Sequence, residues 1–487
     1  MSVNILEFNP LYLWKHFDEI RKIPRPSKKE KAIGDYVVSI AKAYGYEYDR
    51  DEIGTIVIRV PASPGYESAD IVIIQSHLDM VCEKNSDVEF DFDNDAIQLR
   101  QEGDWLYAQG TTLGSDNGIG VAALLAAMDD PKLVHGPLEL LFTIDEETGL
   151  TGAAELRTDF LKGKTLINLD SEEEGNFSIG CAGGADTRIR LTLSQVTPKP
   201  GRFIRVLLSG FKGGHSGIDI NKNRANTIKL LARILWETSR KVDFRLANFH
   251  GGNAHNAIPR EALADLWVSK DDNSNLRENL EESFKQINLE YKSVESAGGI
   301  TIKDIEEPHE KVLDEQTQKT VLNFLYALPH GVQKMSADIP GLVETSVNLA
   351  TIRLQEGTIN ILMSARSSVT PALKATGDRL EAFAGLAGAE VEREPGYPGW
   401  TPNLDSYVLQ VAKTCYKNLA GKEPVVEAIH AGLECGIIGE KFPGMDMISI
   451  GPQIEHPHSP DERVHISSVE RFWDLLKSML ENLVSQK

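Results

Sequence analysis

The sequence predicts an α/β protein in which a mostly parallel sheet, covered by helices on both faces, is interrupted by an inserted α+β domain. Three observations support this prediction. Helical and strand patterns alternate along the first part of the chain, as they do where helices connect parallel strands. Three apolar runs with the β-branched content of buried strands end in acidic or histidine side chains, at residues 71–79, 138–147 and 166–170. The pattern then changes at about residue 185 and returns after residue 400.

The first part of the chain contains the elements expected of the parallel sheet. An amphipathic helix is predicted around Leu11, Leu13 and Phe17. The other predicted elements are, in order, a helix at 29–44, strands at 55–60 and 71–75, a hairpin-like segment at 97–108, a glycine-rich loop at 110–118, a helix at 119–128, and the strands of the second and third apolar runs.

The second part of the chain is predicted to form the insertion. A linker is predicted at residues 395–402, because three prolines and two glycines punctuate this stretch. The elements predicted before it are strands at 186–193, 202–209 and 262–269 and helices at 224–239 and 275–285; those after it are a helix at 406–419 and a strand at 445–450. We therefore predict one discontinuous domain, residues 1–185 and 400–487, and an inserted domain, residues 186–399.

The composition excludes several classes of partner. Acidic residues outnumber basic ones by 72 to 51, which gives a formal net charge of -21. A field of this sign repels nucleic acid and anionic membrane surfaces, so neither is a predicted partner. The four cysteines are scattered without a Cys-x-x-Cys motif, and no apolar stretch is long enough to span a membrane. We therefore predict a cytoplasmic protein.

The polar side chains that follow the three apolar runs indicate a metal site. In open α/β sheets the chemistry lies beyond the carboxyl ends of the strands, so these side chains are expected to converge. His77 and Asp79 are two residues apart on a strand and therefore project to the same side. Several carboxylates gathered in a cleft repel one another unless a cation neutralises them. The candidates from the three runs are His77, Asp79, Glu146, Glu147 and Asp170.

Two more candidate ligands lie outside the apolar runs. Asp116 belongs to the glycine-rich loop, and His458 lies in the segment 456–462 near the end of the chain. With these residues the cluster can hold two ions. Imidazoles and carboxylates suit Zn²⁺, with Co²⁺ or Mn²⁺ as further candidates, whereas the chain has no pair of cysteines at ligand spacing.

The order of these candidates along the chain resembles that of the dizinc aminoacylase and carboxypeptidase-like metallopeptidases. The resemblance is closest to the aminoacyl-histidine dipeptidase branch of that family, which includes carnosinase-like enzymes. It spans most of the chain, and it is the joint order of the motifs that is specific. The segments that carry it are residues 76–84, 112–120, 145–149, 431–436 and 458–462.

The resemblance implies a role for each candidate in a metal-dependent dipeptidase. It implies that metal-activated water attacks the peptide bond and that a glutamate acts as general base. The implied roles are that His77 and Asp170 bind one zinc, Glu147 and His458 bind the other, Asp116 bridges both, Asp79 accepts the second ring N–H of His77, and Glu146 is the general base.

Three residues of the insertion also acquire roles from the resemblance. His215, in Gly-Gly-His-Ser-Gly, would polarise the scissile carbonyl, and Asn256 lies in a segment similar to the family's lid asparagine segment. Arg366 would hold the free carboxylate of a short peptide, because an arginine fork matches a carboxylate. The resemblance thus predicts a cytoplasmic enzyme that hydrolyses Xaa-His dipeptides in its discontinuous domain and uses the insertion as a lid and for homodimerisation.

Each candidate residue also has an ordinary structural explanation. Asp116 is placed to cap the following helix, and Glu146 and Glu147 could be solvated loop acids, as we predict for Glu172, Glu173 and Glu174. The remaining alternatives are that His456 or His465 replaces His458 as ligand, that His215 is an exposed residue of a glycine turn, and that Arg366 forms a surface ion pair.

Other functions remain open at this stage. The same machinery would serve an aminoacylase or a tripeptidase. A nucleotide-dependent α/β enzyme could use the loop 111–120, although this loop lacks both the Gly-x-Gly-x-x-Gly order and a Gly-Lys-Ser/Thr ending. A non-catalytic metal-binding protein would need the ligands without the general base.

Overall fold

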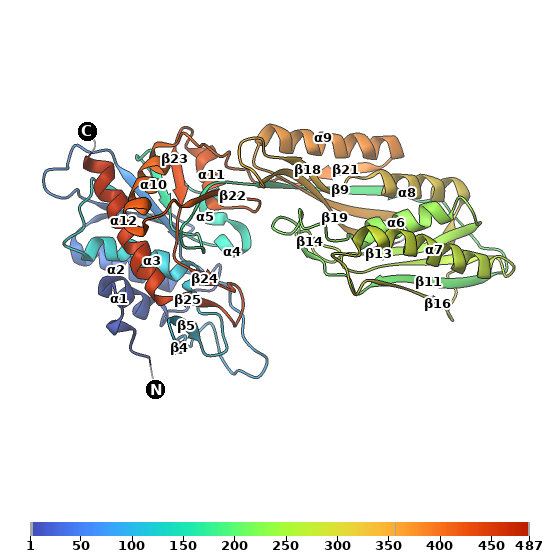
Figure 1. Ribbon diagram of the computed structural model, residues 1–487, viewed down its shortest axis with the longest axis horizontal. Helices are drawn as coiled ribbons and strands as arrows, with labels where there is room; N and C mark the ends of the chain where they lie inside the picture. The colour runs from blue at the N-terminus through green and yellow to red at the C-terminus, as the bar shows by residue number, and fades with distance from the viewer. Residues whose placement is uncertain (1–2, 356, 486–487) are drawn as a thin grey trace. The chain divides into compact units, whose positions relative to one another are not determined.

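The computed structural model describes residues 3–355 and 357–485 (Figure 1). The chain forms two compact units. Unit 1 comprises Met1–Gly180, Trp400–Ala428 and Leu433–Lys487, and unit 2 comprises Cys181–Gly399 and Ile429–Gly432. The division after Gly399 falls within the proline- and glycine-rich segment 395–402.

Unit 1 is built on an eight-stranded sheet with the strand order β1-β2-β6-β3-β7-β23-β8-β22. The four central strands β6, β3, β7 and β23 are parallel, and β1, β2 and β8 join them in antiparallel pairs. The predicted α/β class with a mostly parallel sheet is confirmed. The strands span Glu47–Arg50 (β1), Ile56–Val60 (β2), Leu138–Thr143 (β6), Val72–His77 (β3), Thr165–Asn168 (β7), Asp446–Ser449 (β23), Asn176–Cys181 (β8) and Val425–Ile429 (β22).

Burial explains why the central strands are apolar. Every residue of β3 and β6 is buried, as expected for parallel strands that are covered on both faces. Helix α3 packs on β3 and on α1, and every residue from Ser115 to Met128 is buried, so α3 is a core helix. The helices of unit 1 are α1 (Leu11–Ile20), α2 (Lys31–Tyr44), α3 (Ser115–Asp129), α4 (Glu146–Gly149), α5 (Thr151–Ala154), α10 (Tyr407–Ala420), α11 (Glu434–Lys441) and α12 (Ile466–Ser485), with a 3-10 turn, η1, at Ile5–Glu7.

A second, four-stranded sheet of unit 1 joins distant parts of the chain. Its order is β24-β25-β5-β4, so the C-terminal strands pair with the hairpin that precedes the glycine-rich loop. This pairing fixes the segment between β24 and β25, which contains His458, beside the loop that contains Asp116. The strands span Leu99–Glu102 (β4), Trp105–Ala108 (β5), Ile454–Glu455 (β24) and Arg463–His465 (β25).

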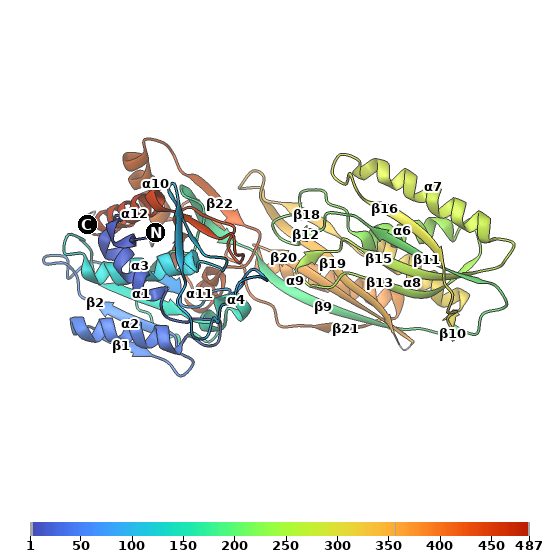
Figure 2. The same cartoon turned by 90° about the horizontal axis from the view of Figure 1, so that it is seen from below.

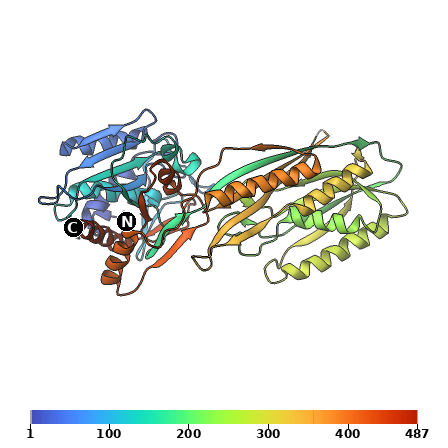
Figure 3. The same ribbon diagram turned by 90° about the horizontal axis from the view of Figure 1, so that it is seen from above.

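Unit 2 contains a nine-stranded antiparallel sheet and four helices. The strand order is β16-β11-β15-β13-β19-β20-β9-β21, and β18 also pairs with β19. Figure 3 looks onto the helices of unit 2, whereas Figure 2, from the opposite side, looks onto its strands. The strands span Gly183–Thr192 (β9), Arg202–Ser209 (β11), Phe244–Gly251 (β13), Ala262–Val268 (β15), Gly299–Asp304 (β16), Gly331–Met335 (β18), Val343–Gln355 (β19), Thr358–Ser367 (β20) and Glu390–Arg393 (β21).

The core of unit 2 lies between this sheet and its helices. Apolar side chains of the strands, such as Ile204, Leu266 and Ile352, are fully buried with those of α6, such as Leu231 and Leu235. The helices span Thr227–Thr238 (α6), Asn273–Tyr291 (α7), Glu315–Ala327 (α8) and Thr370–Ala387 (α9), and two short two-stranded pairs are formed by β10 (Gln195–Val196) with β17 (Val312–Leu313) and by β12 (Gly214–His215) with β14 (Ala257–Ile258).

Candidate metal centre

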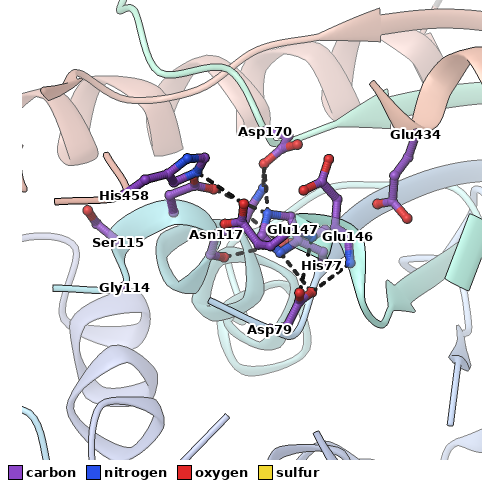
Figure 4. A network of polar contacts seen from close by, with 12 residues as sticks. His77, Asp79, Gly114, Ser115, Asn117, Glu146, Glu147, Asp170, Glu434 and His458 are labelled. Atoms are coloured by element: carbon purple, nitrogen blue, oxygen red, sulfur yellow. Dashed lines mark hydrogen bonds and ion pairs between the residues drawn. The ribbon is translucent and has the colours of Figure 1, made fainter. Parts of the chain in front are cut away.

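His77 is the last residue of β3, and its imidazole points into a group of carboxylates (Figure 4). Its Nε2 atom lies 3.2 Å from Oδ1 of Asp116 and 3.2 Å from Oδ1 of Asp170. Because β3 lies between β6 and β7, the polar segments that follow these three parallel strands leave the same edge of the sheet. The structure therefore brings together side chains that are far apart in the sequence.

Asp116 presents its two carboxylate oxygens to two different imidazoles. Oδ1 faces Nε2 of His77 at 3.2 Å, and Oδ2 faces Nε2 of His458 at 3.1 Å. The backbone of Asp116 is not helical, with φ -81° and ψ 112°, and the peptide bond to Asn117 is cis. The carboxylate does not cap the helix, so this alternative is wrong.

The free backbone N–H groups at the start of this helix are capped by Glu462, a residue from a distant part of the chain for which the sequence suggested no role. Its buried carboxylate accepts hydrogen bonds from the backbone N–H groups of Leu113 (2.7 Å), Gly114 (2.9 Å), Ser115 (2.7 Å) and Asp116 (3.3 Å). It also accepts one from the Ser115 hydroxyl at 2.6 Å. A helix start with several free N–H groups requires such an acceptor. Glu462 thereby holds the loop that carries Asp116.

A glycine of α3, Gly120, allows a close approach of the Asn117 side chain. Asn117 donates a hydrogen bond to Asp170, and its Oδ1 accepts one from the Ser76 hydroxyl at 2.7 Å. A Cβ atom on Gly120 would lie 1.9 Å from this same Oδ1 atom. Glycine is therefore required at position 120 for Asn117 to orient Asp170.

His458 completes the second side of the cluster. Its Nε2 atom lies 3.0 Å from Oε2 of Glu147, whose side chain is 4% exposed. The two alternative histidines lie elsewhere. Among the described residues, His456 belongs to none of the groups of potential ligand atoms, and His465 forms an ion-pair contact with Asp104 at 3.2 Å.

The geometry and donor set of the cluster fit a pair of divalent cations. Potential ligand atoms lie within 4.8 Å of one another in three groups. Two of these groups share Asp116, as a bridging carboxylate requires, and imidazole with carboxylate oxygen is a common ligand set for Zn²⁺. The groups are His77, Asp116 and Asp170; Asp116, Glu147 and His458; and His77, Glu146 and Glu147.

The electrostatics of the carboxylates also fit a cation. Burial raises the pKa of Glu146 well above its usual range, and the charges of Asp170 and Glu147 raise it further. Burial likewise raises the pKa of Glu147 and of Asp170, and the charge of Asp116 adds to both. Apart from the imidazoles, the buried Arg25 guanidinium acts on Asp79 and Asp116, but it hydrogen-bonds to backbone carbonyls of Leu78, Asp79 and Gly114. A divalent ion would remove the repulsion among the carboxylates.

The imidazoles are held by the same carboxylates. Hydrogen bonds to Asp116 and Glu147 raise the pKa of His458 to about 11. Burial lowers the pKa of His77, but the charge of Asp170 and the hydrogen bonds to Asp116, Asp170 and Asp79 outweigh burial and raise it well above its usual range. Both rings therefore face anionic oxygens at the Nε2 position where a cation would bind.

Asp79 connects the two parts of the cluster. Its Oδ1 atom lies 3.3 Å from Nδ1 of His77, on the side of the ring opposite to Asp116. The same carboxylate accepts hydrogen bonds from the backbone N–H groups of Glu146 (3.0 Å) and Glu147 (3.2 Å) and from the Ser27 hydroxyl (2.7 Å). Burial raises the pKa of Asp79, but the contacts with His77 and these donors outweigh it and lower the pKa to about 2.

Glu434, which lies in the segment 431–436, is a second buried acid for which the sequence suggested no role. It is the first residue of α11, and its Oε2 atom accepts hydrogen bonds from the Gln75 amide (2.6 Å) and the Thr143 hydroxyl (2.7 Å). Gln75 in turn accepts a hydrogen bond from the Asn168 amide at 2.6 Å. These contacts join the ends of β3, β6 and β7. Burial raises the pKa of Glu434 to about 8.

The prediction that Glu172 is solvated is wrong. Glu172 is half-buried and lines a small pocket together with Asp116 and Asp170. Burial raises the pKa of Glu172 to about 9, and the charges of Asp116 and Asp170 contribute in the same direction. Glu173 is exposed as predicted, whereas Glu174 forms an ion pair with Arg471.

In unit 2, His215 lies in the short strand β12, and Asn256 immediately precedes the adjacent short strand β14. His215 pairs with Ala257 between β12 and β14, and Asn256 precedes β14 with its side chain exposed. Nδ1 of His215 accepts hydrogen bonds from the N–H groups of Gly217 and Ile218, each at 3.2 Å. The ring proton of neutral His215 therefore lies on Nε2, which leaves Nε2 as a hydrogen-bond donor.

Arg366 lies in β20 and is 7% exposed. Its Nη1 atom donates a hydrogen bond to the Tyr397 hydroxyl at 2.8 Å, and its Nε atom is buried without a hydrogen-bond partner. Within the described residues no acidic side chain forms an ion pair with Arg366, so the surface ion-pair alternative is wrong. A buried guanidinium without an anionic partner is costly unless a ligand supplies the anion.

The sequence of the chain matches a known family over most of its length. The pattern that defines peptidase family M20/M25/M40 matches residues 73–482. The chain belongs to this family. The cytosol non-specific dipeptidase of Escherichia coli is 40% identical to this M20 peptidase over 478 residues, which cover 98% of each chain.

Solved structures agree with this assignment. The aminoacylhistidine dipeptidase of Vibrio alginolyticus superposes on this M20 peptidase with a TM-score of 0.92 and 40% identity, covering 99% of this chain and 98% of the other. An aminopeptidase of Bacillus cereus, 16% identical, shares the fold with a TM-score of 0.57, covering 98% of this chain and 99% of the other. The predicted family resemblance is therefore confirmed.

Proposed function

We propose that the protein is a metal-dependent dipeptidase that hydrolyses aminoacyl-histidine dipeptides with two bound divalent cations. The observation that carries this proposal is the carboxylate of Asp116, whose two oxygens face His77 and His458 at 3.2 and 3.1 Å. The membership in an M20 peptidase family and the similarity to two dipeptidases support it. Zn²⁺ is the proposed ion, and Co²⁺ or Mn²⁺ are the alternatives.

The residues of unit 1 divide into ligands, a general base and supporting acids. His77 and Asp170 would hold one cation, Glu147 and His458 would hold the other, and Asp116 would be shared between the two groups of ligands. When bound, such ions act as Lewis acids and lower the pKa of water from about 15.7 to about 7. Glu146 takes the proton of the attacking water and returns it to the leaving amine. Its raised pKa, caused first by burial, suits both steps.

Asp79 has two tasks in this proposal. It accepts the Nδ1 proton of His77, which fixes the tautomer that leaves Nε2 free to bind a cation. It also holds the backbone of Glu146 and Glu147, so the general base and a ligand are positioned by one carboxylate.

Three residues of unit 2 bind the substrate in this proposal. His215 donates its Nε2 proton to the oxygen of the scissile carbonyl, where negative charge develops. Arg366 holds the free carboxylate of the dipeptide as a bidentate partner. Asn256, which is exposed beside His215, adds a hydrogen bond to the substrate. A carboxylate subsite of this kind favours dipeptides over long chains.

The alternatives from other classes lack support at specific residues. A nucleotide phosphate at the loop 111–120 would need backbone N–H groups that are taken by Glu462. A metal-binding protein without catalysis has no use for Glu146, a carboxylate beside the ligand set whose pKa is raised by burial. An aminoacylase or a tripeptidase would use the same unit 1 residues and differs only in its substrate.

A substrate panel and metal removal test the proposal. Purified protein should contain roughly two equivalents of divalent metal, lose activity with a chelator, and regain it with Zn²⁺, Co²⁺ or Mn²⁺. It should hydrolyse Ala-His faster than N-acetyl amino acids or tripeptides. Faster turnover of the acylated compounds would replace the dipeptidase with an aminoacylase, and activity that survives complete metal removal would refute the metal mechanism.

The cellular setting is part of the proposal. Within the described residues no helix is long and apolar enough to cross a membrane. The relative from Escherichia coli is described as cytosolic, and we propose the same location here. We further propose that unit 2 serves as lid and mediates a homodimer, which size-exclusion chromatography with light scattering would test.

A further inference from the structure

The surroundings of Arg366 differ from those of an ordinary buried arginine. Arg366 lies in the sheet between Gly184 of β9 and Ser346 of β19. Among the described residues, its side chain forms one hydrogen bond, to Tyr397, whose hydroxyl is neutral. The hydroxyl of Ser346 is paired with Nε2 of His430 at 2.7 Å, and burial together with the charge of Arg366 lowers the pKa of His430 to about 4. Tyr397 and His430 are thus uncharged at neutral pH, and the carboxylate of Asp186, whose charge acts on Tyr397, lies 3.2 Å from the His255 imidazole.

Tyr397 is itself held firmly. Its backbone forms two hydrogen bonds with Gly184, at 2.9 and 3.0 Å, although it lies in the segment between β21 and Trp400 that has no regular strand. A Cβ atom on Gly184 or on Gly432 would lie 2.8 Å from ring carbons of Tyr397. These two glycines therefore let the ring lie between them. Burial raises the pKa of Tyr397, so its hydroxyl stays protonated.

A neutral, fixed partner suits an arginine that has to bind an anion. An arginine side chain loses conformational freedom when it binds a ligand. This loss lowers the affinity for the ligand unless the guanidinium is already oriented. A carboxylate partner would orient it but would also neutralise its charge and compete with the ligand. The Tyr397 hydroxyl orients Nη1 without either effect, and Nε remains without a partner within the described residues.

We propose that Tyr397 is a positioning residue that orients Arg366 toward the free carboxylate of the dipeptide. This inference rests on the proposed carboxylate-binding role of Arg366. Tyr397 acts through Arg366 and does not touch the reacting atoms, so its loss should weaken the binding of carboxylate-bearing substrates and leave the chemical step unchanged.

The test compares Tyr397→Phe with the unaltered protein on two substrates. One is Ala-His, and the other is its C-terminal amide, which lacks the carboxylate. Removal of one hydrogen bond to a charged group should raise KM for Ala-His by about 5- to 20-fold, with kcat within about twofold. For the amide, kcat/KM should change by less than about twofold. Tyr326→Phe, in the same unit with its ring against Trp236, is the matched control and should leave all constants unchanged.

Two further measurements separate the possible outcomes. If Tyr397 only stabilises the fold, Tyr397→Phe will lower the melting temperature and affect acid and amide equally, which would overturn the proposal. Arg366→Ala should abolish the preference for acid over amide. If Arg366→Ala keeps that preference, the carboxylate role fails and the inference fails with it. If Arg366→Ala abolishes the preference while Tyr397→Phe leaves it intact, only the role of Tyr397 is refuted.

Discussion

The metal cluster of unit 1 and the surroundings of Arg366 in unit 2 carry opposite charge surpluses. In unit 1, Asp116, Glu146, Glu147 and Asp170 gather with two imidazoles, and the buried Arg25 guanidinium near Asp116 is bonded to backbone carbonyls. In unit 2, Arg366 is buried and its hydrogen-bond partner is a neutral hydroxyl. Each charge surplus is unfavourable in the protein alone, so each region is suited to a ligand of the opposite charge. Under the proposed function, the first region binds cations and the second binds an anion.

The two regions also differ in how they are supported. Around Asp116 the support includes two carboxylates: Glu462 binds the backbone N–H groups of the loop, and Asp79 binds those of Glu146 and Glu147. The Arg25 guanidinium binds a carbonyl of the same loop, that of Gly114. Around Arg366 the support is a hydroxyl group. Anionic supports strengthen a cation site because they add to its field, whereas they would weaken an anion site.

The largest expected effect concerns the general base in unit 1. Glu146→Gln keeps the size of the side chain but removes its ability to accept a proton, so kcat for Ala-His should fall by at least about 10³-fold. Metal content should remain unchanged, because His77, Asp116, Glu147, Asp170 and His458 are intact. Metal analysis and steady-state kinetics measure both quantities. Glu173→Gln, at an exposed position, is the control, and a kcat within tenfold of the unaltered protein would exclude Glu146 as the base.

An intermediate effect is expected from the anionic support of Asp116. Glu462→Gln preserves the shape of the cap but removes its charge and turns one acceptor into a donor facing N–H groups. Loss of such a supporting group should weaken metal affinity by about 10- to 100-fold. Competition with a chromogenic chelator measures this change. If metal affinity stays the same while thermal stability falls, Glu462 supports the fold alone.

The sequence predicted the members of the metal cluster better than their supports. His77, Asp170 and Glu147 follow apolar strands, and the parallel order of those strands brings their ends together. The contacts of Glu462 are different, because they join a side chain to backbone N–H groups 346 to 349 residues away. Almost every residue type has a backbone N–H group, so the residues that donate to Glu462 could not be recognised from composition or spacing.

Two other differences between the sequence-based predictions and the structure, at Glu172 and at Tyr397, have similar causes. Glu172 is one of three consecutive glutamates, and only the course of the chain after β7 distinguishes it from exposed Glu173. Tyr397 lies in the segment 395–402, whose prolines and glycines correctly indicated an irregular connection. The contact of Tyr397 with Arg366 was not predicted, because a segment rich in proline and glycine is not expected to supply a fixed side chain.

The smallest expected effect tests whether the surroundings of Arg366 need to remain uncharged. His430 is 7% exposed, faces Arg366 and His215, and has a pKa lowered to about 4, whereas an unfolded histidine titrates near 6.5. Between these values the unfolded chain binds the extra proton, so the free energy of unfolding should fall as the pH falls. Averaged between pH 5 and 7, this one group should contribute a slope of about 0.9 kcal/mol per pH unit, because the limit of about 1.4 kcal/mol per pH unit holds only well between the two pKa values. Urea unfolding at pH 5, 6 and 7 measures the slope, and His430→Gln, which stays neutral, should reduce it by that average contribution. An equal slope in both proteins would mean that His430 accepts a proton beside Arg366 in the folded state, and the charge contrast between the two regions would then rest on Tyr397 alone.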